Sequence, residues 1–374
     1  MEKSAMAPEE DTVSNLPYDI IRIILLRLSV KDLLRFKSVS KSWNTMISDL
    51  WFVRMHLHES KHSDSHILFL RKKSTEHGED RFSLVRLEGL KFQIEAELNC
   101  PFRGERVLCT CDSVMLLTSS YRTYTLWNPS TRTKAMIWFP YKFDEYMTMK
   151  HGICHDTTID DFKVVVASKK YYVVYSCKNK SWTKRKELSD SLVGRSTESG
   201  GVAVDGAIYW VSASANSYSR ATKSYNSREI IYFDARDDNF RILERPKNVN
   251  DNDRYYLVCL RGCLCLYHRI RYDIQIWIKE KGRDNNSWKE LMIVENVKTP
   301  ISWFKPLCFV ENKILIRLDA TRFVVYSPCE KTFEEFEESK LSLEIKFVPC
   351  HNSLLCPIQN TRPKRKRSAY SQLS

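Results

Sequence analysis

The residues best suited to metal chemistry lie close together in the segment KHGICHD, which contains His151, Cys154 and His155. Imidazole and thiolate groups are ligands that zinc prefers, so the residue types alone would allow a metal site. Zinc sites usually add a second, distant ligand pair, and the twelve cysteines of this chain form no CxxC pair. We therefore interpret the three residues as strand and turn residues and predict no metal site.

An adjacent acidic pair, Asp160 and Asp161, could serve as general acid and base. The pair directly precedes the apolar run FKVVVAS, where acidic residues favour a turn that enters a strand. The motifs GxSxG, HExxH, GxxxxGK[ST] and GxGxxG are absent, and only ten glycines could build a phosphate-binding loop. The sequence thus predicts a protein that is not an enzyme and uses no cofactor.

The charge balance is basic, because 59 Lys and Arg residues face 46 Asp and Glu residues over 374 positions. Part of the excess comes from the acid-free run PKRKR near the C-terminus. Such a run is typical of a nuclear-import signal, which would consist of Lys364, Arg365, Lys366 and Arg367; a solvated tail is the alternative. The remaining positive charge suits an acidic protein partner and would also permit weak nucleic-acid contact.

The N-terminal sequence MEKSAMAPEED carries acids where a signal peptide has its apolar stretch, and no apolar run is long enough to cross a membrane. We therefore expect a cytoplasmic or nuclear protein without membrane contact. In such a compartment the cysteines are buried thiols rather than disulfides.

Helical periodicity marks the first sixty residues. Leu16, Ile20 and Ile24 recur at a spacing of four residues, which places them on one face of a helix that Pro17 can start. Ser29 and the acid three residues later resemble a capping box that begins a second helix, and a third follows Ser40. Three short helices bury little area by themselves, so their apolar residues require a partner.

This segment resembles the F-box, the helical motif that binds a Skp-family adaptor. The resemblance covers residues 14–57 and rests on LPYDIIRIILLRLSVKDLLRFKSVSKSWNTMISDLWFVRMHL. The family often has an acid where Arg22 stands and a proline where Ser29 stands. The resemblance implies that apolar side chains contact the adaptor, and the expected anchors are Leu16, Pro17, Ile20, Ile24, Leu33, Val39 and Trp43. A three-helix subdomain packed on the rest of the chain is the alternative.

From about residue 66 the sequence consists of short β-branched and aromatic runs separated by polar turns. One cassette recurs, in which a strand ends, a polar turn follows and an aromatic residue opens the next strand. Its anchors Trp127, Tyr175, Phe233, Trp277 and Tyr326 are spaced by about 50 residues, which is typical of a propeller blade. With a weaker first copy, the repeat predicts a mainly β chain in which a small helical domain precedes a propeller-like domain of six blades.

The same region resembles the F-box-associated (type 1), kelch-like domain of plant F-box proteins, including S-locus F-box-like and F-box/kelch-repeat proteins. The matching stretches are LWNPSTR, HDTTIDDFKVV, VYSCKNKSW, GGVAVDGAIYWV, IIYFDARDDNF, LRGCLCL and IQIWIKEKGRDNNSWKEL. The glycine signature of kelch repeats is poor, since Gly200 and Gly201 form the only double glycine. The expected organisation is a disordered leader (1–13), an F-box (14–57), a β-domain (66–357) and a basic disordered tail (358–374).

Together the resemblances imply a non-catalytic substrate-recognition subunit of an SCF-type (Skp–cullin–F-box) ubiquitin ligase. The F-box would bind the adaptor, and through it the cullin and RING subunits, while the β-domain captures a protein target for ubiquitination and proteasomal degradation. Two alternatives stay open. One is a pollen S-locus F-box protein that recognises ribonucleases in self-incompatibility, and the other is a nucleic-acid-binding β-protein.

Target binding is expected on loops of the β-domain, because its strands are committed to packing. Three polar loops are long enough, at residues 212–228, 245–254 and 279–286. The first combines aromatic and basic side chains, as binding hot spots do, and its candidate residues are Tyr218, Arg220, Lys223, Tyr225 and Arg228. A loop without a partner is the alternative.

Overall fold

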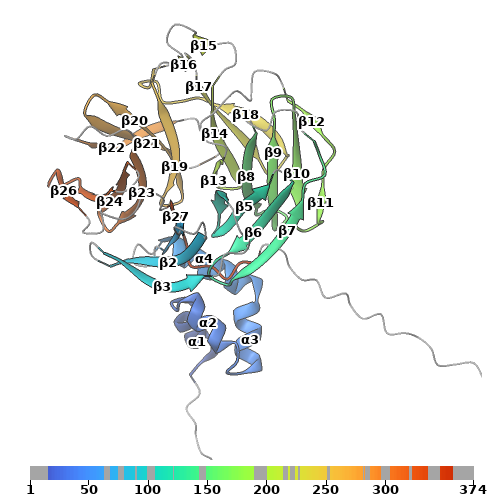
Figure 1. Ribbon diagram of the computed structural model, residues 1–374. Coiled ribbons are helices and arrows are strands. Elements are labelled where there is room, and N and C mark those ends of the chain that lie inside the picture. Colours follow the sequence, from blue (N-terminus) through green and yellow to red (C-terminus); the bar gives the residue numbers. More distant parts are fainter. Residues whose placement is uncertain are drawn as a thin grey trace, which may run out of the picture.

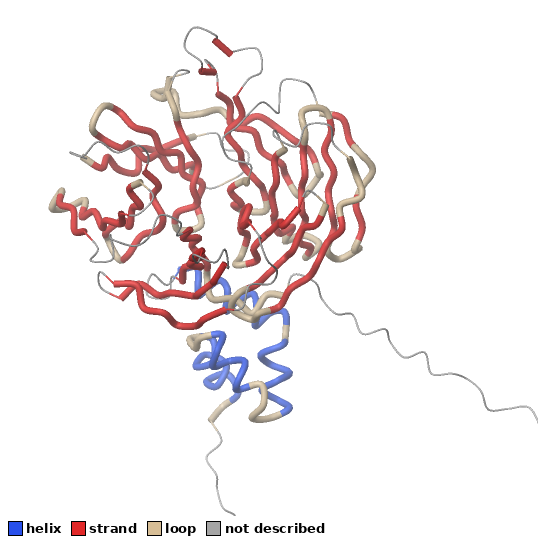
Figure 2. Tube along the Cα trace, viewed as in Figure 1, coloured by secondary structure: helices blue, strands red, loops and turns tan. Residues whose placement is uncertain are grey.

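The computed structural model has a small helical part at one end of a large body of strands (Figure 2). It describes residues 16–62, 68–74, 80–88, 91–98, 106–120, 122–142, 149–188, 200–213, 218–219, 224–225, 228–250, 253–280, 282, 287–295, 304–319, 322–335 and 346–356. The expected leader and the basic tail with its candidate import signal lie outside these residues.

Four helices form the N-terminal part. They are α1 (Tyr18–Leu26), α2 (Val30–Phe36), α3 (Lys41–Ser48) and α4 (Leu50–His62). The caps follow the sequence signals, because the hydroxyls of Ser29 and Ser40 accept hydrogen bonds from backbone amides three residues later. The Asp32 carboxylate accepts from the Ser29 hydroxyl at 2.7 Å, not from a backbone amide as in a capping box. The prediction of three helices missed α4, whose first amides donate to the Asp49 carboxylate.

The described strands of the rest of the chain form antiparallel sheets, mostly of strands that follow one another in the sequence. Five of these sheets have four strands each. The first contains β27 (Lys346–Cys350), β1 (Leu68–Ser74), β2 (Asp80–Glu88) and β3 (Lys91–Leu98). The second contains β4 (Arg106–Cys111), β5 (Val114–Ser120), β6 (Thr123–Asn128) and β7 (Thr133–Trp138). Another contains β13 (Val202–Val204), β14 (Ala207–Ala213), β17 (Arg228–Asp234) and β18 (Asn239–Leu243).

The last two four-stranded sheets follow along the chain. One contains β19 (Tyr255–Leu260), β20 (Cys263–Ile270), β21 (Asp273–Lys279) and β22 (Trp288–Val294), and the other contains β23 (Phe304–Val310), β24 (Lys313–Leu318), β25 (Arg322–Ser327) and β26 (Thr332–Glu335). A five-stranded sheet contains β8 (Lys150–Asp156), β9 (Asp161–Ala167), β10 (Tyr171–Ser176), β11 (Ser181–Trp182) and β12 (Lys186–Glu187). A separate hairpin pairs β15 (Tyr218–Ser219) with β16 (Ser224–Tyr225).

The sheets are arranged around a common centre, and the C-terminal strand closes the ring (Figure 1). Strand β27 pairs with β1, so the two ends of the β-domain meet in one sheet. Such radial closure leaves only short strand edges exposed. The expectation of a mainly β chain in which helices precede a β-propeller is confirmed.

The repeated cassette is the hairpin between the third and fourth strands of a sheet. The same turn position holds Arg132, Lys180, Asp238 and Lys331, each with φ between 53° and 59°. A left-handed residue at this point lets a short polar turn reverse the chain. The cassette therefore recurs because the same local turn ends the third strand of several sheets.

Tryptophans of the cassette join neighbouring sheets, as expected for structural residues. The indole N–H of Trp182 donates to the Trp138 carbonyl at 2.8 Å, and that of Trp288 donates to the Glu244 carbonyl at 2.8 Å. Each bond connects the fourth strand of one sheet to the sheet before it, at the last residue of the fourth strand (Trp138) or the residue directly after it (Glu244). Trp127, Trp210 and Trp277 are buried in the sheets.

Candidate functional site

Several large apolar side chains of the helical part are exposed. Leu16 is 58% exposed, Ile20 42% and Ile24 47%, although such residues normally lie in a core. The further exposed residues of the same helical part include Tyr18, Ile23, Leu34, Val39, Leu50 and Trp51. We call this set, with Leu16, Ile20 and Ile24, the apolar helix surface. Its burial against a partner would be favourable by about 25 cal/mol per Å² of apolar area.

The structure divides the expected adaptor anchors into two groups. Pro17 and Val39 are exposed together with Leu16, Ile20 and Ile24. Leu33 is fully buried in the helical core, so its assignment to a contact surface is corrected: it supports the helices from within.

Trp43 is half-buried and packs edge-on against Phe36, with ring centroids 5.4 Å apart. Its contribution is therefore mainly to the packing of α2 against α3. The sequence analysis did not include Tyr18, Ile23 and Trp51 among the anchors. The exposure of these side chains depends on how α1 and α4 pack, and not only on the spacing of apolar residues in the sequence.

The basic residue at the family's usual acidic position has local partners. The Arg22 guanidinium lies 3.2 Å from the Asp19 carboxylate and 4.9 Å from the centre of the Trp51 ring. These contacts connect α1 with α4 at the edge of the apolar helix surface. Arg22 is thus accommodated without disturbing the helix start.

Helix α4 joins the helical part to the propeller through a charged network. Arg54 pairs with Asp160 at 2.6 Å, and Lys61 pairs with Asp112. The His155 ring lies between the two acids, with Nε2 2.9 Å from Asp160 and Nδ1 3.5 Å from Asp112. The five charged groups therefore link α4 to the β4–β5 and β8–β9 turns.

The network shifts the pKa of its members. Burial disfavours the charged form of His155, but hydrogen bonds and charge from Asp112 and then Asp160 outweigh it and raise the pKa of the imidazole. For Asp112, burial opposes ionisation, yet His155 and Lys61 hold the pKa of its carboxyl far below the usual range. The folded protein thus favours the ionised form of both groups.

A segment after β27 forms a second link. The backbone amide of Asn352 donates to the Ser60 hydroxyl of α4 at 3.1 Å. Leu354 packs in the helical core, while Leu355 packs in the core of the propeller with Leu57 of α4. The C-terminal end of the β-domain therefore holds the helices against the propeller.

The residues considered for metal binding have structural roles on β8. The Cys154 thiol donates to the Lys163 carbonyl at 3.8 Å, and His155 belongs to the junction network. Burial, with the charges of Arg106 and Lys150, lowers the pKa of His151 to about 4. Among the residues that the structure describes, no group of three or more His, Cys, Asp or Glu side chains could hold a metal ion.

The acidic pair lies at a turn, as predicted. Asp160 has a positive φ of 53°, and Asp161 is the first residue of β9. The Asp161 carboxylate accepts hydrogen bonds from the Ser176 hydroxyl at 2.5 Å and the Lys178 amide at 2.8 Å. Both carboxylates are therefore engaged in the fold.

The two faces of the propeller carry different turns. The β4–β5 and β8–β9 turns contact α4, and we call the face of the propeller on which they lie the near face. Because neighbouring strands are antiparallel, every turn between a first and a second strand lies on this face, and so does every turn between a third and a fourth strand. The loops between second and third strands and the connections between sheets lie on the opposite face, which we call the far face. Strands β15 and β16 lie at that end of the molecule (Figure 1).

The candidate target residues belong to the β14–β17 connection on the far face. Tyr218 and Tyr225 are backbone partners in the β15–β16 hairpin, and Arg228 begins β17. Arg220 and Lys223 lie outside the described residues. The connection after β18 also lies on the far face.

The third candidate loop starts at the end of β21, the third strand of its sheet, and leads into the fourth strand β22. Topology therefore places the two strand ends that this loop joins, Lys279 of β21 and Trp288 of β22, on the near face with the helices. The three candidate loops therefore do not all lie on one face, and target binding on them stays a prediction. Among the described residues, no helix is long and apolar enough to cross a membrane.

Comparison with known proteins identifies the family. Residues 13–55 match the F-box domain, and residues 84–356 match the F-box associated beta propeller domain. F-box protein CPR1 of Arabidopsis thaliana is 25% identical over 378 residues, covering 90% of this chain and 86% of that protein. An F-box/kelch-repeat protein of Arabidopsis thaliana is 25% identical over 327 residues, covering 81% and 85%.

Among solved structures, the propeller domain of Myceliophteria thermophila Cps50 (Swd1) matches with a TM-score of 0.41 and 9% identity, covering 73% of this chain and 86% of that chain. The family match extends over most of the chain and includes both the helices and the propeller. The chain therefore belongs to the F-box proteins with an F-box-associated β-propeller domain.

Proposed function

We propose that this protein is the non-catalytic substrate-recognition subunit of an SCF-type ubiquitin ligase. The apolar helix surface binds a Skp-family adaptor and, through it, the cullin and RING subunits. The propeller captures a protein target for ubiquitination and proteasomal degradation. The observation that carries the proposal is the exposure of Leu16, Ile20 and Ile24 in the helical part that the F-box family match covers.

The junction supports this role. A receptor acts by holding its target at a high effective concentration near the conjugating enzyme, so the orientation of its two parts matters. Ion pairs from α4 and the segment after β27 attach the helices to the near face. The far face is left for the target, at the end of the molecule opposite the adaptor.

The proposal includes a propeller of six blades. In the five-stranded sheet, β11 and β12 both pair with β10, through Trp182 opposite Tyr175 and Glu187 opposite Tyr171. The two short strands thus lie along the same edge of β10, as a single fourth strand that is interrupted between residues 182 and 186. Counted by position, this sheet also has four strands and serves as a blade.

Affinity purification from plant cells tests the proposal. A tagged full-length chain is isolated with and without a proteasome inhibitor, and co-purified proteins are identified by mass spectrometry. We expect an adaptor and a cullin in both samples and at least one further protein enriched by the inhibitor. Absence of adaptor and cullin from the wild-type sample, with the protein folded, would contradict the proposal.

A further inference from the structure

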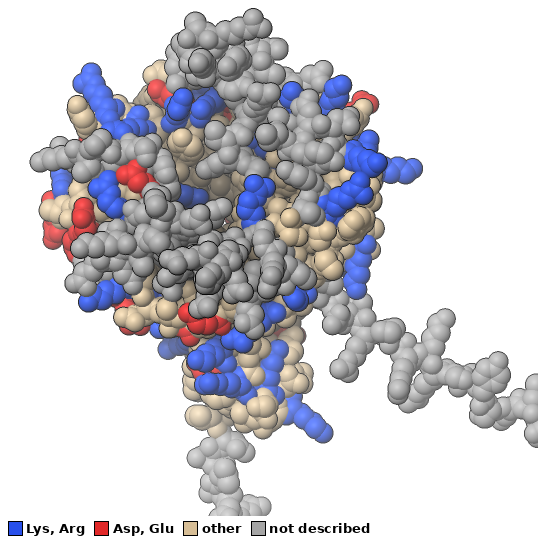
Figure 3. Space-filling view, in the orientation of Figure 1, with Lys and Arg blue, Asp and Glu red and all other residues tan. Residues whose placement is uncertain are grey.

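Basic side chains gather on the outer side of the five-stranded sheet, along the segment 182–188 that contains β12. Figure 3 shows Lys and Arg side chains on the right of the view, over the strands that Figure 1 labels β11 and β12. The exposed cations of this area include Lys142, Lys170, Lys184 and Arg185. Lys142, Lys170 and Lys184 form no ion pair with any residue that the structure describes. The area therefore presents positive charge that a partner can neutralise.

Hydrogen bonds between two neighbouring sheets arrange this area as a seam. The Trp182 indole donates to the Trp138 carbonyl at 2.8 Å, and Arg185 donates from Nη2 to the Lys142 carbonyl at 2.9 Å. The chain that leaves β7 at Trp138 thus runs beside the segment 182–188.

The same segment reaches the β9–β10 turn at its other end, where the Leu188 amide donates to the Lys170 carbonyl at 2.7 Å. This turn joins the second and third strands of its sheet and therefore lies on the far face. We call the surface formed by residues 136–142, 169–170 and 182–188 the basic seam.

Acidic side chains are scarce along the basic seam. Its residues include six Lys and Arg and a single acid, Glu187. The neighbouring sheet brings one further acid close, since the Lys186 ammonium donates to the Asp238 carbonyl at 3.3 Å. The Asp238 carboxylate, however, pairs with Lys163 at 2.9 Å. The charge of the seam is thus left largely without counterions among the described residues.

The backbone that carries these cations is held in place. The Arg185 guanidinium lies 5.3 Å from the centre of the Tyr141 ring, and the Tyr141 hydroxyl donates to the Thr183 carbonyl at 2.6 Å. These contacts fix the residues next to Lys142 and Lys184. A surface that is ordered in advance loses less conformational entropy when it binds a partner.

Exposed apolar side chains lie at the start of the basic seam. Met136 is 63% exposed and Trp138 61%. Alternate residues of a strand point to the same side, so both side chains share the outward face of β7. An exposed tryptophan beside basic residues is typical of binding hot spots. The seam therefore combines an apolar end with a row of cations.

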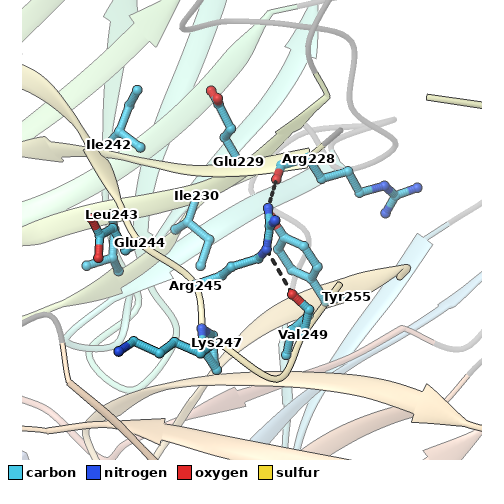
Figure 4. A pocket seen from close by; sticks show the side chains of 11 residues that line it. Arg228, Glu229, Ile230, Ile242, Leu243, Glu244, Arg245, Lys247, Val249 and Tyr255 are labelled. Atoms are coloured by element: carbon cyan, nitrogen blue, oxygen red, sulfur yellow. Dashed lines mark hydrogen bonds between the residues drawn. The ribbon is translucent and has the colours of Figure 1, made fainter. Parts of the chain in front are cut away.

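The pocket between β17, β18 and the start of β19 does not offer such a surface, although three cations line it. Arg245 already donates to the carbonyls of Val249 and Arg228. Figure 4 shows the side chains of Arg228 and Lys247 pointing in opposite directions, away from the pocket. Its cations therefore do not converge on one anionic group, and they provide a comparison for the basic seam.

We propose that the basic seam binds an acidic segment of the protein target. Carboxylates of that segment contact Lys142, Lys170 and Lys184, and its apolar side chains contact Met136 and Trp138. The proposal rests on the proposed receptor function and adds the chemical class of the target. Opposite charge steers such a segment to the seam and favours it over other sequences, while the apolar contacts slow its release.

Fluorescence anisotropy with the full chain bound to its Skp-family adaptor tests this inference. The probes are the fluorescein-labelled acidic peptide Glu-Leu-Glu-Glu-Leu-Glu, its neutral counterpart Gln-Leu-Gln-Gln-Leu-Gln and an oligothymidylate of the same length. The seam variant is Lys170→Gln with Lys184→Gln. The control variant is Lys247→Gln with Arg271→Gln, which removes two exposed cations elsewhere on the propeller and leaves the same net charge.

A second pair of variants tests the apolar contact. Trp138→Ser removes the exposed indole of the seam, and Tyr272→Ser removes an aromatic side chain that is 70% exposed in the β20–β21 turn. Both side chains lie mostly in solvent, so neither change should lower the melting temperature appreciably.

We expect the wild type and the control variant to bind the acidic peptide alike, and the seam variant to bind it at least about tenfold more weakly. Trp138→Ser should weaken binding at least about threefold and Tyr272→Ser should not. The neutral peptide and the oligothymidylate should both bind more weakly than the acidic peptide.

Equal affinity of the seam and control variants, equal binding of the neutral peptide, or no saturable binding of the acidic peptide would overturn the inference. Equal affinity of Trp138→Ser and Tyr272→Ser would overturn it as well. Tighter binding of the oligothymidylate would assign the seam to nucleic acid and would also contradict the inference.

Adaptor binding of the same variants separates this inference from the proposed function. If the seam variant loses the acidic peptide but still binds the adaptor, both stand. If the wild type binds no adaptor, the receptor function fails whatever the probes do. If the adaptor binds and the probes do not distinguish the variants, only the assignment of the seam fails.

Discussion

The side chain of Asn128 and the backbone of Leu355 are joined by a buried hydrogen bond of 2.8 Å across 227 positions of the sequence. The same amide also donates to the Ser353 carbonyl at 2.9 Å. Asn128 ends β6 at the near face, whereas Ser353 and Leu355 follow the strand that closes the ring. One fully buried amide therefore connects a blade turn, the ring closure and the helical junction.

Asn128→Ala should destabilise the protein by about 2–4 kcal/mol, because it leaves two buried carbonyl groups without their donor. Urea denaturation of the full chain measures the change in the free energy of unfolding. Asn179→Ala is the control, since Asn179 is exposed in a comparable hairpin turn and should have little effect. Equal stability of the two variants would show that the Asn128 bonds contribute nothing.

Lys163 connects two sheets from a nearly buried position on β9. Its ammonium lies 3.1 Å from Asp156 and 2.9 Å from Asp238, and donates to the Ala235 carbonyl at 2.6 Å. Lys163→Met should cost roughly 2–4 kcal/mol, because a buried carboxylate at Asp156 loses its counterion while Asp238 is partly solvated.

Lys331→Met is the matched control for this change. It removes an equal charge from an exposed pair with Glu295, and pairs of this kind contribute little. Thermal unfolding of both variants provides the comparison. A larger fall in melting temperature for Lys331→Met than for Lys163→Met would contradict the assignment of Lys163 as a link between sheets.

The junction network predicts a specific pH dependence. The folded protein raises the pKa of His155 above its ordinary value of 6.5, so the imidazolium contributes stability that is fully present below that value and is lost as pH rises through the folded-state pKa. His155→Gln should therefore be destabilising at about pH 6 and less so at about pH 9.

Urea denaturation of wild type and His155→Gln at both pH values measures this difference. His151, whose lowered pKa gives the opposite dependence below pH 6.5, is present in both proteins and cancels in the comparison. A destabilisation that grows as the pH rises would mean that His155 is neutral in the folded protein.

Local features of the fold could be predicted from the sequence. Ser29 and Ser40 were identified as helix caps because a hydroxyl satisfies amides only three residues away. The repeated cassette predicted the hairpins because a polar turn with a left-handed residue, such as Arg132 or Lys331, is a property of a few neighbouring residues. The propeller followed from the period of that turn.

Features that depend on distant contacts could not be predicted in this way. Leu33 has the spacing of a surface anchor but is buried, because α3 and α4 cover it. Nothing in the sequence near Arg54 indicates Asp160 as its partner, since the two meet only when the propeller packs on α4. The placement of Lys279 and Trp288, the strand ends around the third candidate loop, on the near face likewise required the strand order.

Calorimetric titration of a Skp-family adaptor into the full chain tests the central claim most directly. The variant Ile20→Asp with Ile24→Asp places charge on the apolar helix surface, and Ile94→Asp with Ile242→Asp places equal charge on exposed apolar positions of the propeller. We expect the helix variant to lose at least about tenfold in affinity, because each buried isoleucine contributes about 1.5–3 kcal/mol, while the propeller variant binds as the wild type does. A folded helix variant that retains wild-type affinity would contradict the claim that these helices bind the adaptor.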